Sequence, residues 1–217
     1  MFNMSFSSRI SVFSLTLFLC ACTTSQPEPP PQPSSLHTIT LSANVAMPES
    51  PEFEPSGGAI TTVLNAMGAK SGNTRIEQLK TLIARGDIDI RQMILSSIRK
   101  ELEKPGMPIK LVERGGEADL QLSVEAYGMH KGFEWAVVPS IDIQANLVDT
   151  NGTIIWDSHE YVDQRHEFRS AVRSNTFSAY QDDPEQLKAD YTANIAWVVH
   201  NLIDGLKEDH ASGDIGE

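Results

Sequence analysis

The feature that most constrains the fold is a regular alternation of apolar and polar side chains in the middle of the chain. Residues 118–128 read ADLQLSVEAYG, and their apolar positions recur at every second residue: Leu120, Leu122, Val124 and Ala126. Residues 140–149 read SIDIQANLVD and repeat the pattern at Ile141, Ile143, Ala145 and Leu147. Because successive side chains of a strand point to opposite faces, both segments are predicted to be strands with one covered face.

Tight turns connect these strands to others. Asp149-Thr150-Asn151-Gly152 is predicted to be a type I′ hairpin turn, because Asn-Gly accepts the positive φ angles that this turn requires. Residues 153–162 then return as a strand, with Ile154 and Trp156 expected on one face, and a short strand is expected at 109–113. Strands joined in this way predict an antiparallel sheet of about four to five strands.

Two helices have clear start signals and apolar stripes. Asp89 and Gln92 form an N-terminal capping pair, and Pro105-Gly106 ends that helix. Asp183 caps the last helix, and Pro184 occupies its first turn, where a missing N–H costs nothing. The first stripe consists of Ile90, Met93, Ile94, Ile98 and Leu102, and the second of Leu187, Tyr191, Ile195, Val198, Leu202 and Leu206.

The remaining helical signals lie in residues 57–86, which predict two short helices broken at 68–72. The second is expected to begin at Thr74, with Glu77 completing a capping box. The predicted fold class is therefore α+β: a two-layer domain over residues 57–206, with an antiparallel sheet and helices on one face. Residues 207–217 are expected to form a disordered tail.

The N-terminus has the character of an export signal. Its apolar run, residues 10–21, is shorter than the ~20 residues that a helix needs to cross a bilayer, and it ends in small residues. The segment Leu19-Cys20-Ala21-Cys22 resembles the lipobox of bacterial lipoproteins. The resemblance implies that residues 1–21 are a signal peptide and that Cys22 becomes an acylated N-terminus. An ordinary signal peptide that contains cysteines is the alternative.

The resemblance also implies a destination. Thr23 follows the acylated cysteine, whereas Asp at this position is the usual inner-membrane retention signal in Gram-negative relatives. By this resemblance the protein is anchored at the periplasmic face of the outer membrane. Because Cys20 is removed with the signal, the mature chain retains one cysteine and no disulfide is expected within the monomer.

Residues 22–56 are predicted to be a linker. Five prolines fall among the 13 residues that follow Cys22, and they favour an extended polyproline II spacer. Residues 38–47 alternate within this linker and predict a strand, whose apolar positions are Ile39, Leu41, Ala43, Val45 and Met47. The surrounding prolines favour an edge position for it.

The charge of the mature chain limits its partners. From Cys22 onward there are 16 basic and 29 acidic residues, a balance of −13. Such a chain repels the phosphates of nucleic acids and the headgroups of anionic lipids. We therefore expect no nucleic-acid partner, and we expect membrane attachment through the acyl chains on Cys22.

No catalytic or cofactor site is predicted. The densest group of ionisable residues is Asp157, His159, Glu160 and His166, for which a weak cation site and a merely polar strand face are alternatives. The six histidines show no paired metal spacing, so no metal site is predicted. Neither Gly-x-Ser-x-Gly nor His-Glu-x-x-His occurs, and no cofactor is expected.

One stretch stands out between the two long strands. Residues 127–140, YGMHKGFEWAVVPS, are predicted to be a loop that carries Met129, Phe133 and Trp135. Aromatic side chains on a connecting loop are candidates for binding a partner. We therefore consider Phe133 and Trp135 as partner-binding residues, and the alternative is that they close one end of the core.

The order of elements over residues 88–206 is similar to that of small periplasmic lipoprotein domains, many uncharacterised and others accessory parts of secretion, polysaccharide-export or cell-wall-synthesis machines. The resemblance implies a lipid-anchored, non-catalytic adaptor or accessory subunit with an envelope protein as partner. The alternative is a periplasmic carrier of a small ligand, or a hydrolase acting on an envelope polymer.

Overall fold

The computed structural model describes residues 35–54, 71–169 and 171–215 and confirms the α+β fold class. The strands are β1 (Thr38–Leu41), β2 (Glu52–Glu54), β3 (Lys110–Val112), β4 (Ala118–Lys131), β5 (Ala136–Asp149), β6 (Ile154–Val162) and β7 (Asn175–Thr176). The helices are α2 (Ser71–Arg85), α3 (Ile90–Leu102), the short 3₁₀ helix η1 (Gln164–His166), α4 (Phe177–Asp182) and α5 (Pro184–Ser212). Residues 1–34 and 55–70 lie outside the described residues, and with them Cys22 and the first of the two helices expected between 57 and 86.

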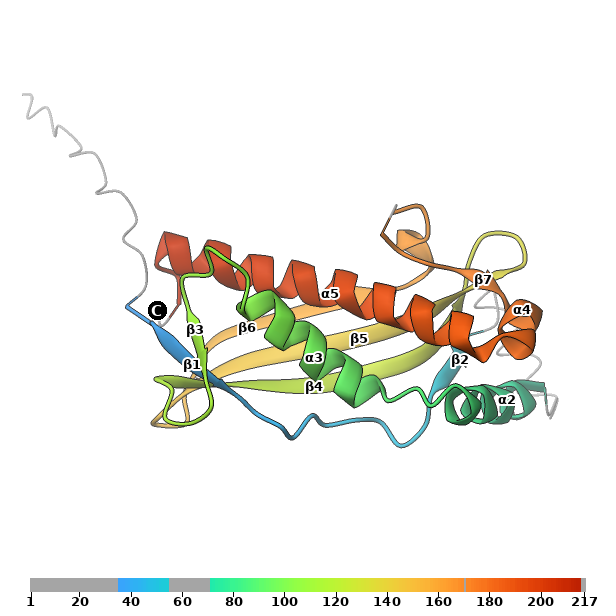
Figure 1. Ribbon diagram of the computed structural model, residues 1–217, viewed down its shortest axis with the longest axis horizontal. Helices are drawn as coiled ribbons and strands as arrows, with labels where there is room; N and C mark the ends of the chain where they lie inside the picture. Colours follow the sequence, from blue (N-terminus) through green and yellow to red (C-terminus); the bar gives the residue numbers. More distant parts are fainter. Residues whose placement is uncertain (1–34, 55–70, 170, 216–217) are drawn as a thin grey trace, which may run out of the picture. The chain divides into compact units, whose positions relative to one another are not determined.

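The sheet forms one layer, and α3 and α5 lie side by side across one of its faces (Figure 1). Its main strands follow the order β3-β1-β4-β5-β6. β4, β5 and β6 are antiparallel, as predicted, but β1 pairs in parallel with both β3 and β4. The sheet is therefore mixed rather than antiparallel, because β1 reaches its neighbours through long crossovers and not through hairpins.

The segment expected to be an edge strand at 38–47 is shorter and lies inside the sheet. β1 ends at Leu41 and lies between β3 and β4, so the predicted edge position is wrong for these residues. Beyond it the chain continues along β4 through single backbone contacts, with Ala46 N–H donating to Leu122 O at 3.3 Å and Val124 N–H donating to Ala46 O at 2.9 Å. It then pairs with β4 again as β2.

A β-bulge changes the faces of β4. Val124 pairs with Ile143 and Ala126 pairs with Asp142, so Glu125 is an extra residue in the ladder. Because side chains alternate with a period of two, one extra residue exchanges the faces. The prediction that Ala126 points inward with Val124 is therefore wrong.

A second irregularity affects β6. Leu147 pairs with Trp156, but the next pair is Val148 with Ile154, so Ile155 is extra. Trp156 is buried, whereas Ile154 is 56% exposed. The two side chains do not share a face, contrary to the prediction.

The hairpin at 149–152 forms with a different turn from the one predicted. Gly152 has a φ of +86°, but Asn151 does not have a positive φ, which excludes type I′. Gly152 N–H donates to Asp149 O at 3.0 Å, and Asp149 N–H donates to Thr153 O at 2.8 Å. This pattern is a type I turn followed by a left-handed glycine, which is typical of three-residue hairpin loops.

The predicted stripes of the helices form the core. The inward residues of β5 and all six stripe residues of α5 are at most 1% exposed, and they join α3 and α2 in one contiguous cluster. α2 already includes Ser71, so it starts before the predicted Thr74. α5 continues to Ser212, where Gly213 ends it in the left-handed conformation, so the tail predicted from residue 207 is wrong for this part.

Two contacts fix the end of α5. Trp156 Nε1 donates to Asp209 Oδ2 at 2.8 Å, and His210 Nε2 lies 2.9 Å from the carbonyl oxygen of Leu36. His210 is buried, and Ile215 beyond the helix is buried as well. The last helical turns therefore hold the start of β1 in place.

Candidate functional site

The residues predicted to bind a partner lie at the tip of the long β4–β5 hairpin. β4 runs to Lys131 and β5 begins at Ala136, so the predicted loop of 127–140 is reduced to residues 132–135. Phe133 is 62% exposed and Trp135 is 84% exposed, which contradicts the alternative that they close the core. Met129 is fully buried.

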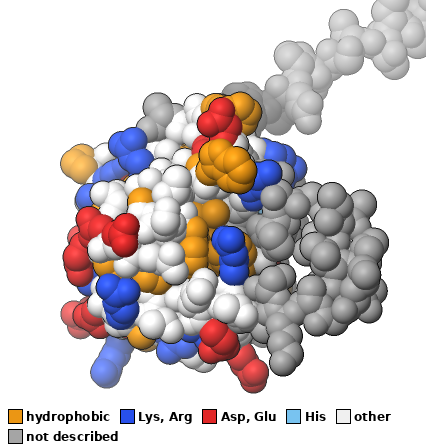
Figure 2. All heavy atoms as spheres, turned by 90° about the vertical axis from the view of Figure 1, so that its right-hand side faces the viewer, with side chains coloured by type: hydrophobic (Ala, Val, Ile, Leu, Met, Phe, Trp, Pro, Cys, Tyr) orange, Lys and Arg blue, Asp and Glu red, His pale blue; other side chains and the backbone are white. Residues whose placement is uncertain are grey.

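A third exposed aromatic side chain joins them from another part of the chain. Phe168 is 79% exposed, and its ring centroid lies 5.9 Å from that of Phe133. We call Phe133, Trp135 and Phe168 the aromatic tip. Figure 2 shows this end of the domain, where hydrophobic side chains stand on the surface with acidic and basic ones beside them. Sequence reasoning missed Phe168, because it lies in an irregular segment with no periodic pattern.

The turn that carries Phe133 and Trp135 is well defined. Ala136 N–H donates to Phe133 O at 3.0 Å, and Gly132 N–H donates to Ala136 O at 2.9 Å. Glu134 has a φ of +54°, which non-glycine residues rarely adopt unless the surroundings hold them there. The backbone of the turn that carries the two aromatic side chains is therefore held in a defined conformation.

Glu167 ties this turn to the segment that carries Phe168. Its Oε2 accepts the backbone N–H of Phe133, and its Oε1 accepts the hydroxyl of Ser174 at 2.9 Å. A Cβ atom on Gly132 would lie 2.6 Å from the same carboxylate, so only glycine fits there without a shift. One carboxylate thus joins both sides of the aromatic tip.

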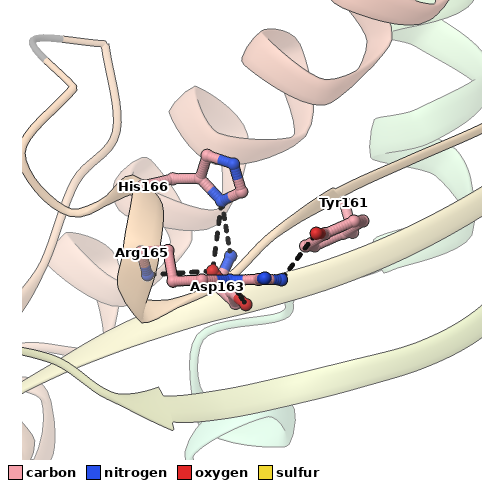
Figure 3. A network of polar contacts seen from close by, with 4 residues as sticks. All are labelled: Tyr161, Asp163, Arg165 and His166. Atoms are coloured by element: carbon pink, nitrogen blue, oxygen red, sulfur yellow. Dashed lines mark hydrogen bonds and ion pairs between the residues drawn. The ribbon is translucent and has the colours of Figure 1, made fainter.

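A polar network fixes the start of that segment (Figure 3). Arg165 Nε donates to Asp163 Oδ2 at 2.8 Å, and Arg165 Nη2 donates to the hydroxyl of Tyr161 at 2.5 Å. The hydrogen bond to Asp163 raises the pKa of Arg165 above its usual value. His166 Nδ1 lies 3.2 Å from Asp163 Oδ1, and the centroid of its ring lies 5.0 Å from that of Trp197 in α5.

Asn194 of α5 fixes the other end of the segment. This fully buried side chain accepts the N–H of Arg173 at 2.7 Å and donates to the carbonyl oxygens of Arg173 and Pro139 at 3.0 and 2.8 Å. The segment formed by residues 163–169 and 171–174, which we call the tip segment, is thus held at both ends and in its middle. The side chains of Asp163, Arg165, Glu167 and Ser174 are engaged in positioning it.

The group considered as a weak cation site does not converge. His159 Nε2 contacts Asp142 Oδ1 at 2.5 Å, whereas His166 contacts Asp163. Glu160 pairs with the buried Ile143 on the covered face, and burial raises the pKa of its carboxyl group. Within residues 35–54, 71–169 and 171–215, no three histidine, cysteine or carboxylate side chains gather as a metal site would require.

The uncovered face of the sheet carries a polar cavity of about 320 Å³. Its lining includes Ser140, Asp142, His159 and Tyr161. His159 pairs with Gln144, four residues along β5 from Ser140, which places them about 13 Å apart along the ladder. His159 Nε2 is engaged with Asp142 Oδ1, and no hydrogen bond joins Ser140 to His159 among the described residues, so the contacts present do not connect a nucleophile with a base.

Comparisons with known proteins define no family for this chain. No family model and no curated protein matches it. Among solved structures, it is similar to a DUF330 protein of Xanthomonas campestris, with 11% identity over 84% of this chain and 89% of the other and a TM-score of 0.48. A minor lipoprotein of Acinetobacter baumannii matches with 11% identity over 84% and 96% of the two chains and a TM-score of 0.37.

A third similar structure is a putative lipoprotein of Caulobacter crescentus, with 14% identity over 60% of this chain and 86% of the other and a TM-score of 0.36. At such identities and TM-scores, these likenesses carry no functional conclusion. Of the helices in the described part of the chain, none has the length and apolar content needed to cross a bilayer.

Proposed function

We propose that this protein is a bacterial envelope lipoprotein, anchored through acyl chains on Cys22 at the periplasmic face of the outer membrane. In this proposal it acts as a non-catalytic accessory subunit that holds a protein partner through the aromatic tip. The lipobox-like segment Leu19-Cys20-Ala21-Cys22 and the proline-rich spacer support the anchor. The spacer gives the domain reach from the membrane.

The observation that carries the proposal is the exposure of Phe133, Trp135 and Phe168 on a rigidly held tip. Large exposed aromatic side chains are favoured anchors of protein interfaces, because they bury much apolar area and lose little conformational entropy. The hydrogen bonds of Glu167 and Asn194 already fix the chain around them. Binding therefore does not have to order this region first.

Chemical cross-linking in intact cells, followed by capture of the full-length protein, tests the proposal. Replacement of both Phe133 and Trp135 by alanine is expected to leave folding intact, because neither side chain belongs to the core, and to abolish the cross-linked complex. Ile154→Ala is the matched control, since Ile154 is also exposed but lies at the opposite end of the hairpin ladder. If the double variant forms the complex at the level of the wild type, the tip does not hold the partner.

A second candidate function is the binding of a small polar ligand in the 320 Å³ cavity of the uncovered face. Ser140 supports it, because this cavity-lining side chain is only 4% exposed although it lies on the uncovered face. Ser140→Phe would fill part of the cavity. The accessory function predicts normal complex formation in this variant, whereas the carrier function predicts loss of ligand binding.

A further inference from the structure

The stretches that form the aromatic tip are slightly basic, whereas the mature chain as a whole is acidic. Residues 131–135 and the tip segment contain four basic residues and three acidic ones, a balance of +1. The rest of the mature chain contains 12 basic and 26 acidic residues, a balance of −14. The stretches that carry the exposed aromatic side chains therefore do not share the strongly acidic balance of the mature chain.

Most of these cations are not used to hold the fold. Arg165 is paired with Asp163, but Lys131, Arg169 and Arg173 have no ion-pair partner among the described residues. Arg169 follows Phe168 directly, and Lys131 lies two residues before Phe133. Arg173 uses only its backbone groups, in the bonds to Asn194.

The nearby carboxylates do not neutralise them. Asp163 accepts from Arg165, and Glu167 accepts from the N–H of Phe133 and from Ser174, so both are engaged inside the tip. Glu134 is the remaining acidic side chain of the turn. Three cations without an ion pair in the described part of the chain thus belong to the same stretches as the three exposed aromatic rings.

We propose that the partner that binds the aromatic tip is a protein surface with an apolar socket rimmed by carboxylates. This inference rests on the proposed function and adds the chemistry of the partner. The rings fill the socket, and Lys131, Arg169 and Arg173 face its rim. Complementary rim charges raise the rate of encounter and exclude partners of the wrong sign.

An anionic bilayer has a similar chemistry, but the length of the chain disfavours it. Ile39 pairs with Ala118 at the start of β4, and the tip lies beyond Lys131 at its other end, about 44 Å away at 3.4 Å per residue. The 14 residues from Cys22 to Leu36 reach about 43 Å when fully extended as polyproline II. With the strands perpendicular to the bilayer that holds the acyl chains, the tip could meet it only if this spacer were fully stretched.

Site-specific photo-cross-linking in the full-length protein distinguishes these possibilities. A photoreactive amino acid replaces Trp135, and mass spectrometry identifies what it captures in intact cells. We expect a protein adduct whose cross-linked peptide lies beside an apolar pocket flanked by Asp or Glu. A lipid adduct, or a cross-linked surface without acidic residues, would overturn the inference.

Charge reversal provides the second measurement. Arg169→Glu combined with Arg173→Glu is expected to lower the yield of the Trp135-position adduct about tenfold, whereas Lys at both positions preserves it. The matched control is the reversal of Arg91 and Arg99, two exposed residues of α3. An unchanged yield after reversal at 169 and 173 refutes the acidic rim. The accessory function itself fails only if the Phe133 and Trp135 alanine variant still forms the complex, so the two failures are distinguishable.

Discussion

Asn194 offers a quantitative test of how the tip is held. Its side chain is fully buried and makes three hydrogen bonds, to Arg173 N–H and to the carbonyl oxygens of Arg173 and Pro139, at 2.7 to 3.0 Å. Alanine at this position leaves all three backbone groups without this partner. At about 1 kcal/mol for each bond, we expect Asn194→Ala to lower the free energy of unfolding by about 3 kcal/mol.

Urea unfolding of the purified mature protein, followed by circular dichroism, measures this loss. For a domain of this size it corresponds to a decrease in Tm of about 6–12 °C. Asn146→Ala is the control, because Asn146 lies on the uncovered face of β5, and we expect a change below about 0.5 kcal/mol.

Asn194→Asp separates hydrogen bonding from packing. It keeps the size of the side chain and the acceptor for Arg173 N–H, but it places an oxygen opposite two carbonyl oxygens. We expect a loss of stability at pH 7 at least as large as that of the alanine variant. Wild-type stability of Asn194→Asp would show that the site depends on packing alone and would refute this reasoning.

Three further predictions concern single positions elsewhere. Gly152→Ala should destabilise the protein by about 1 kcal/mol, because Gly152 has a φ of +86°. Gly205→Ala should instead stabilise it by up to about 1 kcal/mol, because a Cβ atom at this position of α5 meets no other atom. Equal shifts of Tm in the two variants would contradict the turn assignment. Hydrogen bonds, foremost from Thr153 N–H, lower the pKa of Asp149 below its usual 3.8. The stabilisation of the turn by this carboxylate is therefore present above pH 3.8 and is lost as the pH falls through the pKa of Asp149 in the folded protein. An NMR titration that finds this carboxyl group titrating at or above 3.8 would contradict the prediction. Cys22→Ala should abolish labelling with radioactive palmitate and Cys20→Ala should not, and labelling that survives Cys22→Ala would remove the anchor.

The regular parts of the fold were predictable because burial imposes a period on the sequence. The inward residues of β5 and the stripe of α5 alternate or recur without interruption, and they are buried as expected. The prediction failed where one residue is inserted into a strand. Glu125 and Ile155 each shift the pairing, and no residue type marks a bulge clearly enough to reveal that Ala126 and Ile154 lie on the opposite faces.

Other differences arise from tertiary contacts that a local pattern does not contain. The neighbours of β1 depend on a crossover of many residues, so its position inside the sheet is not visible in residues 38–47. Similarly, the polar residues around Asp209 and His210 predict a disordered tail, but the contacts with Trp156 and Leu36 hold this segment against the domain as part of α5.

The candidate site was predictable only in part, for the same reason. Phe133 and Trp135 stood out as aromatic residues between two strands. Phe168 joins them through Glu167, whose contacts span 34 residues of sequence to Phe133. The rigid presentation of the tip depends on such long-range hydrogen bonds and could be found only in three dimensions.

The placement of β1 has a mechanical consequence. Leu36 lies just before the start of β1, and the aromatic tip lies at the far end of β4, which runs parallel to β1. A pull applied between these two ends acts along the strands and loads the backbone bonds of β1 together, among them Lys110 N–H to His37 O and Glu117 N–H to Thr38 O, both at 2.9 Å. Bonds strained in shear resist rupture far better than bonds opened one after another, so the domain can transmit tension as a stiff link between its two ends.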